Sequence, residues 1–572
     1  MKFDFSTTPF SAPGAYIAIS RHVVGDRWHA KADGLYLRSI HSDGDTPFIC
    51  RIEPLCDGKP ADFDCEATHA ELRVNTTAGA IRCCFADDRT LLLRTEGERL
   101  SLRLDFLAGG TYFNLFTEVP YDGRTLWIAN AYKNQMRFVL DPQEGDFEVN
   151  QDWNVTGASV MTTLLRPASG ASSVQLAMRE VRSEWDNKPL PRDYAAALAA
   201  QDASFAAFRD GMPSVPAEFS SARDVAAHNL WSTFVRPEGL LKRDTLLMSK
   251  NWMTRVWSWD HCFNAIALSH SFPDKAWDQL MCLFDLQTPT GVIPDCACDG
   301  QLHWAFCKPP IHGWALRRMM REHDFSLEQL AEAYDHIGRW TDWWFSHRDR
   351  DNNGLCEYTH GNDSGWDNST AFAKGPQVEL PDLQAFLSIQ MDVLADLAAK
   401  LGKTAESASW RKRSDDLLAR MAGTCFDADG TPVARFAYSR EIVPTDSLIL
   451  YLPILLGKRL PEKIRATLVR VLSSDKFLTE WGYATESPKS PAYESNGYWR
   501  GPIWAPSTLL ILDGLHDCGE DALVHRVAER FARMFAKSGC AENFDALTGD
   551  GLCDRAYSWT ASAFLTIAHD YL

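Results

Sequence analysis

With 572 residues, of which 45% are hydrophobic and 23% charged, the chain is long enough for two folded domains and shows no compositional sign of disorder. Its 76 acidic residues outnumber its 58 basic residues, giving a formal charge of -18 without a basic block, so nucleic acid and anionic membranes are disfavoured as partners. The first residues lack the apolar core of a secretory signal and no apolar run is long enough to span a bilayer. These features favour a cytoplasmic protein, unless a leader has been removed.

The 15 cysteines are scattered and odd in number, and no Cys-x-x-Cys occurs. Such spacing fits neither a disulfide framework nor a zinc module, so we expect mostly buried thiols in a reducing compartment. A soft-metal site formed by Cys296, Cys298 and Cys307 is the alternative.

The first third of the chain alternates apolar and polar residues in short runs broken by Gly, Asp and Pro. A period of two is typical of antiparallel strands with one wet face. We therefore predict an N-terminal β-sandwich over residues 1–182. The clearest runs are 34–40, 70–75, 90–94 and 100–105.

An alanine-rich stretch at 193–201 leads to Gly211-Met212-Pro213, which predicts a helical linker over residues 183–215. Residues 216–572 then show recurring helical periods, which predict a second, mainly α domain. Twelve helices favour a six-hairpin toroid, with an inner ring inside an outer one; the alternative is an α-solenoid, but no repeated sequence period favours it. The helices are predicted near 220–235, 259–271, 274–288, 309–323, 326–347, 380–401, 405–423, 446–457, 461–473, 501–516, 519–538 and 556–571.

Residues 360–370, His-Gly-Asn-Asp-Ser-Gly-Trp-Asp-Asn-Ser-Thr, are too rich in turn formers to predict a helix or a strand. They place Asp363 and Asp367 four residues apart, on either side of Trp366. A tryptophan is a poor surface residue but offers a flat apolar face to the C–H side of a sugar. The segment is therefore a candidate carbohydrate site, and an Asx-rich surface turn is the alternative.

A second candidate, Arg255-Val256-Trp257-Ser258-Trp259-Asp260, comes just before a predicted helix. Its alternating tryptophans offer a stacking face beside a carboxylate that can accept hydrogen bonds from two sugar hydroxyls. In the alternative interpretation Asp260 is only a helix N-cap and both tryptophans belong to the core.

Two further segments combine charged groups with constrained turns. Lys308 precedes Pro309-Pro310, whose fixed backbone begins a helix, and is a candidate substrate contact. In segment 496–504, Arg500 lies beside a Gly-Pro turn, and its guanidinium could bind hydroxyls or orient an acid. The aromatic residues of that segment are Tyr498, Trp499 and Trp504.

Glu542 precedes a glycine-containing loop and the last predicted helix, which carries Trp559. In a toroid this position closes the ring opposite an acid from the middle of the chain, such as Asp367. Glycosidic cleavage requires two acids, one to protonate the departing oxygen and one to deprotonate water. The alternative is a surface glutamate that caps or pairs.

Asp349, Asp351 and Asn353 begin a calcium-loop pattern, but His360 stands where an EF-hand requires an acidic residue. An EF-hand is therefore excluded. A structural calcium turn completed by distant ligands is one interpretation, and a turn without metal is the other.

These segments form an ordered set: Trp257-Ser258-Trp259-Asp260, Pro309-Pro310, Ser364-Gly365-Trp366-Asp367-Asn368-Ser369, Tyr498-Trp499-Arg500-Gly501-Pro502-Ile503-Trp504, and Glu542 with Trp559-Thr560-Ala561. The set resembles glycoside hydrolase family 63, a relative of the trehalases that contains processing α-glucosidase I and the mannosylglycerate and glucosylglycerate hydrolases. The resemblance covers residues 255–561 and leaves the N-terminal third outside.

The resemblance implies an (α/α)6 barrel that cleaves α-glycosides with inversion. By matching position, Asp367 would be the general acid and Glu542 the general base. The Trp259-Asp260 pair would hold the non-reducing sugar. The residues that would line the cup are Tyr498, Trp499, Arg500 and Trp504.

The chain departs from the family pattern at two positions. Asp363 stands where many relatives have Glu, and Lys308 where they have Gln, which leaves the sugar contacts open. Because an inverting pair needs its carboxyl groups about 6.5 to 9.5 Å apart, Asp363 is too close in sequence to Asp367 to be its partner. We expect Asp363 to support the site or bind a hydroxyl, and burial against Trp366 to raise the pKa of Asp367.

The sequence thus predicts an inverting α-glycosidase acting on a short α-glucoside or α-glycosyl conjugate, with a small carbohydrate as partner. No metal or organic cofactor is required for the cleavage. The alternatives are a phosphorolytic or isomerising sugar enzyme on the same toroid and a non-catalytic carbohydrate-binding protein. Lys308 and Arg500 could recognise an acidic aglycone or neutral hydroxyls, and the oligomeric state is left open.

Overall fold

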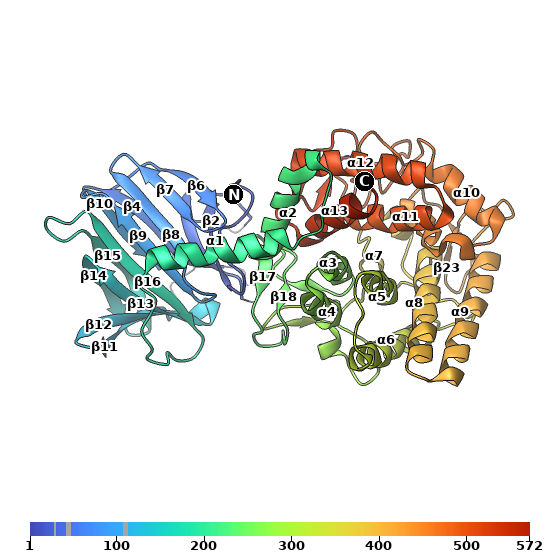
Figure 1. Ribbon diagram of the computed structural model, residues 1–572, viewed down its shortest axis with the longest axis horizontal. Helices are drawn as coiled ribbons and strands as arrows, with labels where there is room; N and C mark the ends of the chain where they lie inside the picture. Colours follow the sequence, from blue (N-terminus) through green and yellow to red (C-terminus); the bar gives the residue numbers. More distant parts are fainter. Residues whose placement is uncertain (28–29, 42–46, 107–112) are drawn as a thin grey trace.

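The computed structural model describes residues 1–27, 30–41, 47–106 and 113–572. The chain forms a β-sandwich followed by a helical domain, and the two lie side by side (Figure 1). This confirms the predicted order of a β region and a helical region. No helix within the described ranges is both long and apolar enough to cross a membrane.

The sandwich consists of two antiparallel sheets. One has the strand order β1-β6-β7-β8-β9-β16-β13-β12-β11, and the other has the order β14-β15-β10-β4-β3-β2, with β5 beside β4. The strands are β1 (Lys2–Phe3), β2 (Ile17–His22), β3 (Gly34–Ser39), β4 (Phe48–Cys56), β5 (Lys59–Pro60), β6 (Asp64–Thr68), β7 (Leu72–Thr76), β8 (Gly79–Phe85), β9 (Thr90–Glu96), β10 (Leu100–Asp105), β11 (Leu115–Tyr121), β12 (Arg124–Ala131), β13 (Met136–Glu144), β14 (Asp146–Asn154), β15 (Gly157–Arg166) and β16 (Ser173–Val181).

The period of two in the sequence becomes an inner and an outer face of each sheet. In β10, Leu100, Leu102 and Leu104 are fully buried while the residues between them are partly exposed. These leucines join the apolar core between the sheets. The pattern predicted from residues 100–105 is therefore confirmed, because one face of the strand packs and the other meets water.

Helix α1 (Tyr194–Asp210) crosses from the sandwich to the helical domain (Figure 1). Asp193 caps its first turn, and Tyr194 and Ala197 pack on a sandwich face. The remaining helices match the predicted spans within a few residues at most ends. They are α2 (Ser220–Thr233), α3 (Asp260–Ser269), α4 (Pro273–Met281), α5 (His312–Glu322), α6 (Leu327–His347), α7 (Gly361–Ser364), α8 (Pro381–Lys400), α9 (Thr404–Thr424), η5 (Leu448–Arg459), α10 (Glu462–Leu472), α11 (Ala505–Cys518), α12 (Asp521–Ser538) and α13 (Ser558–Asp570).

Four predicted segments differ from the structure. The helix predicted over 274–288 ends at Met281 and is followed by a separate 3-10 turn, η3 (Phe284–Leu286). Segment 446–457 is a 3-10 helix, η5, because it contains Pro453 and its end is broken at Gly457, which has φ of 56°. The helix predicted from 501 begins only at Ala505, after the Gly501-Pro502 turn. Residues 361–364, predicted to lack helix, form the single turn α7.

Inside the helical domain, contacts pass from one buried helix to the next and return to the start. Helix α3 contacts α5, α5 contacts α8, α8 contacts η5, η5 contacts α11, α11 contacts α13, and α13 contacts α3. Every residue of α3 is buried, whereas α4, α9 and α12 each keep exposed residues. The fully buried helix α3 therefore lies inside, and helices that keep an exposed face lie outside.

Short hairpins and bridges fill the loops between these helices. The pairs are β17 (Phe234–Val235) with β18 (Thr245–Leu246), β19 (Val256–Trp257) with β20 (Cys296–Ala297) and β21 (Leu302–His303), β22 (Val378–Glu379) with β23 (Ala434–Phe436) and β24 (Ile442–Val443), and β25 (Asn543–Phe544) with β26 (Gly551–Leu552).

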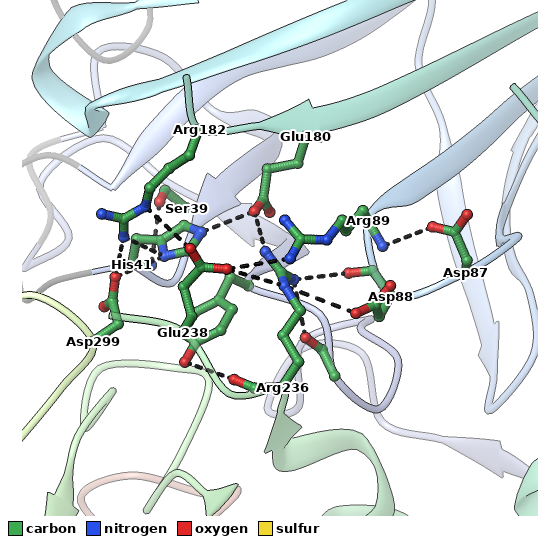
Figure 2. A network of polar contacts seen from close by, with 12 residues as sticks. Ser39, His41, Asp87, Asp88, Arg89, Glu180, Arg182, Arg236, Glu238 and Asp299 are labelled. Atoms are coloured by element: carbon green, nitrogen blue, oxygen red, sulfur yellow. Dashed lines mark hydrogen bonds and ion pairs between the residues drawn. The ribbon is translucent and has the colours of Figure 1, made fainter. Parts of the chain in front are cut away.

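A buried ionic cluster joins the two domains (Figure 2). His41 of the sandwich lies with Nε2 2.9 Å from Glu180 and Nδ1 2.9 Å from Asp299 of the helical domain. Arg236 donates to Glu180 at 2.6 Å, and Arg182 pairs with Asp299. Burial would lower the pKa of His41, but the two carboxylates outweigh it and raise that pKa. The interface is therefore fixed by charges that are paired on both sides.

Candidate active site

A pocket opens among segments that precede the buried helices. Trp259 and Asp260 lie at the start of α3, Lys308 lies before α5, and Asp367 lies before α8. The aromatic loop 498–504 comes before α11, and Tyr557 and Trp559 lie at the start of α13. The lining residues are Met253, Trp257, Trp259, Asp260, Lys308, Gly365, Asp367, Tyr498, Trp499, Trp504, Tyr557 and Trp559.

The loop 360–370 is folded so that its two acids face different surroundings. His360 caps α7, whose last residue is followed by Gly365 with φ of 73°. A Cβ on Gly365 would lie 2.5 Å from the Trp259 ring, and a Cβ on Gly361 would lie 2.1 Å from the Asp367 carbonyl oxygen. Both glycines are therefore required for the loop to pack this tightly.

Asp363 is fully buried and is not among the residues that line the pocket. Its Oδ2 accepts hydrogen bonds from Arg348 and from the backbone and hydroxyl of Thr359, and its Oδ1 accepts one from the Cys307 backbone at 3.1 Å. Although burial opposes ionisation, Arg348 and these donors lower the pKa of Asp363. Asp363 therefore holds the loop, and the alternative expectation, that it binds a sugar hydroxyl, is wrong.

Asp367 is half-buried and lines the pocket. The Lys308 ammonium lies 3.9 Å from Asp367 Oδ1 and 3.1 Å from Asp295 Oδ1. Burial raises the pKa of Asp367, and the charge of Asp295 raises it further, while Lys308 acts in the opposite direction. The predicted rise is thus present in direction, and Asp295 contributes to it.

Asp260 and the tryptophans around it form the apolar part of the pocket. The Trp259 and Trp559 rings pack edge to face, with their centroids 5.6 Å apart. Asp260 is almost fully buried, burial raises its pKa well above the usual value, and its Oδ2 has no hydrogen-bond partner within the described residues. A buried carboxylate oxygen without a donor at the edge of a pocket is suited to a ligand hydroxyl.

The aromatic loop is fastened to the acid loop by Asn368. The Asn368 side chain donates to the Gly497 carbonyl at 3.0 Å and accepts from the Trp499 backbone at 2.9 Å. Between these contacts Tyr498 adopts the left-handed backbone, with φ of 62°. Such a conformation is unfavourable for a non-glycine residue, so the two contacts from Asn368 hold Tyr498 in place.

Glu542 reaches the pocket through Tyr498. The Tyr498 hydroxyl donates to Glu542 Oε1 at 2.8 Å, and the Asp554 backbone donates to Oε2 at 3.3 Å. Burial raises the pKa of Glu542 to about 7, with a further contribution from the negative charge of Asp554. A carboxyl group with this pKa can accept or release a proton near neutral pH.

Five predicted site residues lie outside the pocket lining, and one of them is Glu542, which contacts the lining residue Tyr498. Trp366 is buried and packs on Trp499, with ring centroids 4.7 Å apart, so it supports the aromatic loop instead of stacking on a ligand. Arg255 is buried and donates to Gln301 at 3.0 Å. Arg500 pairs at 2.7 Å with the exposed Glu494. Asp363 holds the loop through its hydrogen bonds to Arg348, Thr359 and Cys307.

The structure adds residues that the sequence did not single out. Met253, Gly365 and Tyr557 line the pocket, and Asn368 and Asp295 hold its charged and aromatic groups. Gly365 and Asn368 flank Asp367 within the recognised motif, so their position could have drawn attention to them. The roles of Asp295 and Tyr557 depend on contacts between distant segments and leave no local signal.

In the turn at 349–353, the carboxylates accept hydrogen bonds from neighbouring residues of the same segment. Asp349 accepts from the Gly354 backbone at 3.1 Å, and Asp351 accepts from the Asn353 side chain at 2.8 Å. Within the part of the chain that the structure describes, no three His, Cys, Asp or Glu side chains group as a metal site. The geometry therefore gives no support to the calcium interpretation or to a site at Cys296, Cys298 and Cys307.

A family model described as "Mannosylglycerate hydrolase MGH1-like glycoside hydrolase domain" matches residues 253–560, more than half of the chain and the whole pocket lining. The chain belongs to this family. It is therefore a glycoside hydrolase, as the resemblance to family 63 indicated. The sandwich lies outside the matched residues.

Individual relatives agree with this assignment. Mannosylglycerate hydrolase MGH1 of Selaginella moellendorffii is 23% identical over 454 residues, which cover 65% of this chain and 90% of that protein. The family 63 mannosylglycerate hydrolase of Thermus thermophilus in complex with glucose is 20% identical, with a TM-score of 0.53, over 60% of this chain and 99% of that one. A bacterial glucoamylase complexed with acarbose is 12% identical, with a TM-score of 0.62, over 98% and 93%. The glucoamylase thus shares the fold across both domains.

Proposed function

We propose that this glycoside hydrolase is an inverting α-glycosidase in which Asp367 is the general acid and Glu542 the general base. The observation that carries the proposal is the convergence of these two carboxyl groups on one aromatic pocket. Asp367 lines the pocket, and Glu542 accepts a hydrogen bond from Tyr498, which also lines it. The raised pKa of Asp367 favours the protonated form that an acid needs, and the pKa of about 7 suits Glu542 as a base near neutrality.

In the proposed reaction, Asp367 gives its proton to the departing glycosidic oxygen while that bond to the anomeric carbon breaks. Glu542 takes a proton from a water molecule, whose oxygen attacks the same carbon from the opposite face. The water needs a gap of about 6.5 to 9.5 Å between the two carboxyl groups. The acid and base together balance the proton transfers, so the proposal requires neither a metal ion nor an organic cofactor.

We propose that the helical domain is an (α/α)6 toroid and that the pocket is the cup at one end of its inner helices. The closed series of contacts from α3 to α13 supports this arrangement. Asp260 Oδ2, which has no hydrogen-bond partner among the residues that the structure describes, would accept a hydrogen bond from a hydroxyl of the non-reducing sugar. The rings of Trp257, Trp259 and Trp559 would pack against the sugar's C–H face.

For the substrate, we propose a short α-glucoside or an α-glycosyl conjugate. Relatives named mannosylglycerate hydrolases support a glycosylglycerate as the first conjugate to test. Lys308 is the basic residue among the described pocket-lining residues, and it would contact the aglycone if that group is acidic. A screen of monosaccharide release from α-linked disaccharides and glycosylglycerates would identify the preferred substrate.

The acid and base assignments are tested by Asp367→Asn and Glu542→Gln on the substrate found in that screen. Each should lower kcat by on the order of 10² to 10⁴-fold, because each removes one proton transfer while preserving shape. A matched control is Glu494→Gln, which alters an exposed carboxylate that lies before the aromatic loop in sequence. Near-normal turnover of either pocket variant would refute its assignment.

The stereochemistry is tested separately by following the first-formed anomer of the product by NMR. Inversion is expected, and retention would remove Glu542 as the base that activates water. A phosphorolytic enzyme is the alternative, and inorganic phosphate would then be required for turnover.

A further inference from the structure

We propose that the β-sandwich positions Glu542 through three residues, Arg38, Asn251 and Asp554. The inference rests on the proposed function, in which Glu542 is the general base. It assigns a role in the reaction to a domain outside the matched residues 253–560, and it names Asp554 as a residue that positions Glu542.

The first step is the contact between the sandwich and the loop 249–252. Arg38, on β3, is 1% exposed and donates to the carbonyl oxygens of Lys250 at 2.5 Å and Asn251 at 2.7 Å. The Lys250 ammonium in turn enters the sandwich and donates to the Ser11 hydroxyl at 3.1 Å and the Ala12 carbonyl at 3.0 Å. A guanidinium buried this deeply is costly unless its donors are satisfied, so these contacts fix the loop firmly.

The second step runs from this loop to Asp554. The Asn251 side-chain amide donates to Asp554 Oδ1 at 3.0 Å and to the Thr7 carbonyl of the sandwich at 2.7 Å. The Asn251 amide therefore links the Asp554 carboxylate to the sandwich through two hydrogen bonds. Asp554 is 2% exposed, and its Oδ1 also accepts from the Ala556 backbone at 3.0 Å. Its carboxylate therefore has a defined place in a buried site.

The third step is the pairing of Asp554 with Glu542. The two residues extend the β25–β26 hairpin, with the Glu542 backbone donating to the Asp554 carbonyl at 2.6 Å. The Asp554 backbone donates to Glu542 Oε2 at 3.3 Å, so a shift of Asp554 would move the base itself. This hydrogen bond and the one from Tyr498 occupy both carboxylate oxygens from defined directions.

The charge of Asp554 also acts on Glu542. The titratable groups facing Glu542 are Tyr498, Tyr557, Cys553, Asp554 and Asp367. Of the two aspartates, Asp554 makes the larger contribution to raising the pKa of Glu542. Removal of the Asp554 charge should therefore make Glu542 a weaker base that loses its proton at lower pH.

The test is the pH profile of kcat/KM for the full-length enzyme with Asp554→Asn, an isosteric change that retains the backbone contacts. The profile of the wild type should rise as Glu542 deprotonates near pH 7. The midpoint of that rise should fall by on the order of one pH unit in Asp554→Asn. An unchanged midpoint would overturn the role of Asp554.

The sandwich contribution is tested by Arg38→Met against Arg89→Met. Both replace an arginine at the domain interface. Arg38 donates to loop 249–252, whereas the Arg89 side chain pairs with Glu238 and the Arg89 backbone donates to Asp87 (Figure 2). Arg38→Met should lower kcat several-fold with KM nearly unchanged, whereas Arg89→Met should leave both unchanged. Equal effects of the two substitutions would show only a general loosening of the interface and would overturn the proposal.

A double-mutant cycle separates a shared path from independent effects. Arg38→Met and Asp554→Asn should combine to less than the product of their separate effects on kcat, because both act through the position of Glu542. If Arg38→Met does not fold, Asn251→Ala replaces it in the same cycle. Full additivity would contradict the proposal. Should Glu542→Gln remain active, the proposed function itself fails; if Glu542→Gln is inactive and the cycle is additive, only this inference fails.

Discussion

The acid loop, 360–370, and the base hairpin, 542–554, are held by different parts of the molecule. Asp367 is surrounded by Lys308, Asp295 and its own loop, all in the helical domain. Glu542 instead rests on Asp554, which is tied through Asn251 to the sandwich. The contacts of Asp367 therefore lie within the helical domain, whereas those of Glu542 also lead to the β-sandwich.

The largest difference is expected between substitutions of Asp363 and Asp367, of which the first should reduce stability and the second should reduce turnover. Asp363→Asn removes one partner of a buried ion pair, and breaking such a pair costs about 3 to 5 kcal/mol because it leaves Arg348 uncompensated. Asp367→Asn should leave the free energy of unfolding nearly unchanged and abolish turnover. Urea unfolding and kcat, measured on both variants, check this. A stable Asp363→Asn enzyme would contradict the supporting role.

The pH dependence of stability sharpens the same contrast. The pKa of Asp363 is lower in the folded protein than in the unfolded chain, where it is about 3.9. The ionised Asp363 therefore makes its full contribution to the free energy of unfolding above about pH 3.9. The contribution is lost as the pH falls through the folded pKa. The wild type should therefore lose stability on acidification below about pH 4, and the Asp363→Asn variant should lose less over the same interval.

Much of this arrangement was predictable from sequence. The apolar faces of the helices repeat along the chain, so most spans were correct, and Asp367 and Glu542 stood in a recognisable ordered set. The direction of individual side chains was not predictable. Trp366 and Trp499 were both predicted to contact the substrate. Of the two, Trp499 lines the pocket, whereas Trp366 is buried and packs against Trp499. The link from Arg38 to Asp554 joins residues far apart in sequence and carries no local pattern.

A substitution at Gly365 would change the conformation of the acid loop without removing a charged group. Gly365→Ala places a Cβ 2.5 Å from the Trp259 ring at a φ of 73°, so the loop must shift and lose its geometry. A strained backbone residue costs about 1 to 3 kcal/mol, and kcat should fall at least tenfold as Asp367 moves. The matched control is Gly549→Ala in the base hairpin, where a Cβ at the same φ of 73° would lie 2.5 Å from Trp481.

The glycine pair distinguishes local geometry from general strain. Both variants should lose similar stability in thermal unfolding, because the steric conflict is alike. Only Gly365→Ala should lose most of its turnover, since Gly549 lies at the tip of the hairpin and Trp481 is outside the pocket lining. Equal loss of kcat in both would mean that activity follows stability alone.

A smaller effect is expected at the contact that joins the acid loop to the aromatic loop. Asn368→Ala removes two hydrogen bonds to the backbone around Tyr498, each worth about 0.5 to 1.5 kcal/mol. Tyr498 would then leave its left-handed conformation and its contact with Glu542. We expect kcat to fall roughly tenfold. Tyr498→Phe should give a similar loss if the Tyr498 hydroxyl is the link, and a much smaller loss would contradict it.

The smallest effect is expected at Arg500, which the sequence placed in the sugar-binding cup. The structure pairs its guanidinium with exposed Glu494, and Arg500 is not among the pocket-lining residues, whereas its neighbours Tyr498 and Trp499 are. A surface ion pair contributes about 0 to 1 kcal/mol, so Arg500→Met should change stability and kcat/KM only slightly. Lys308→Met, by contrast, removes a cation between Asp295 and Asp367 and should lower kcat/KM clearly. If Arg500→Met instead raised KM as strongly as Lys308→Met, the side chain would have to turn inward when substrate binds, and the cup would include a residue that the structure places outside the pocket lining.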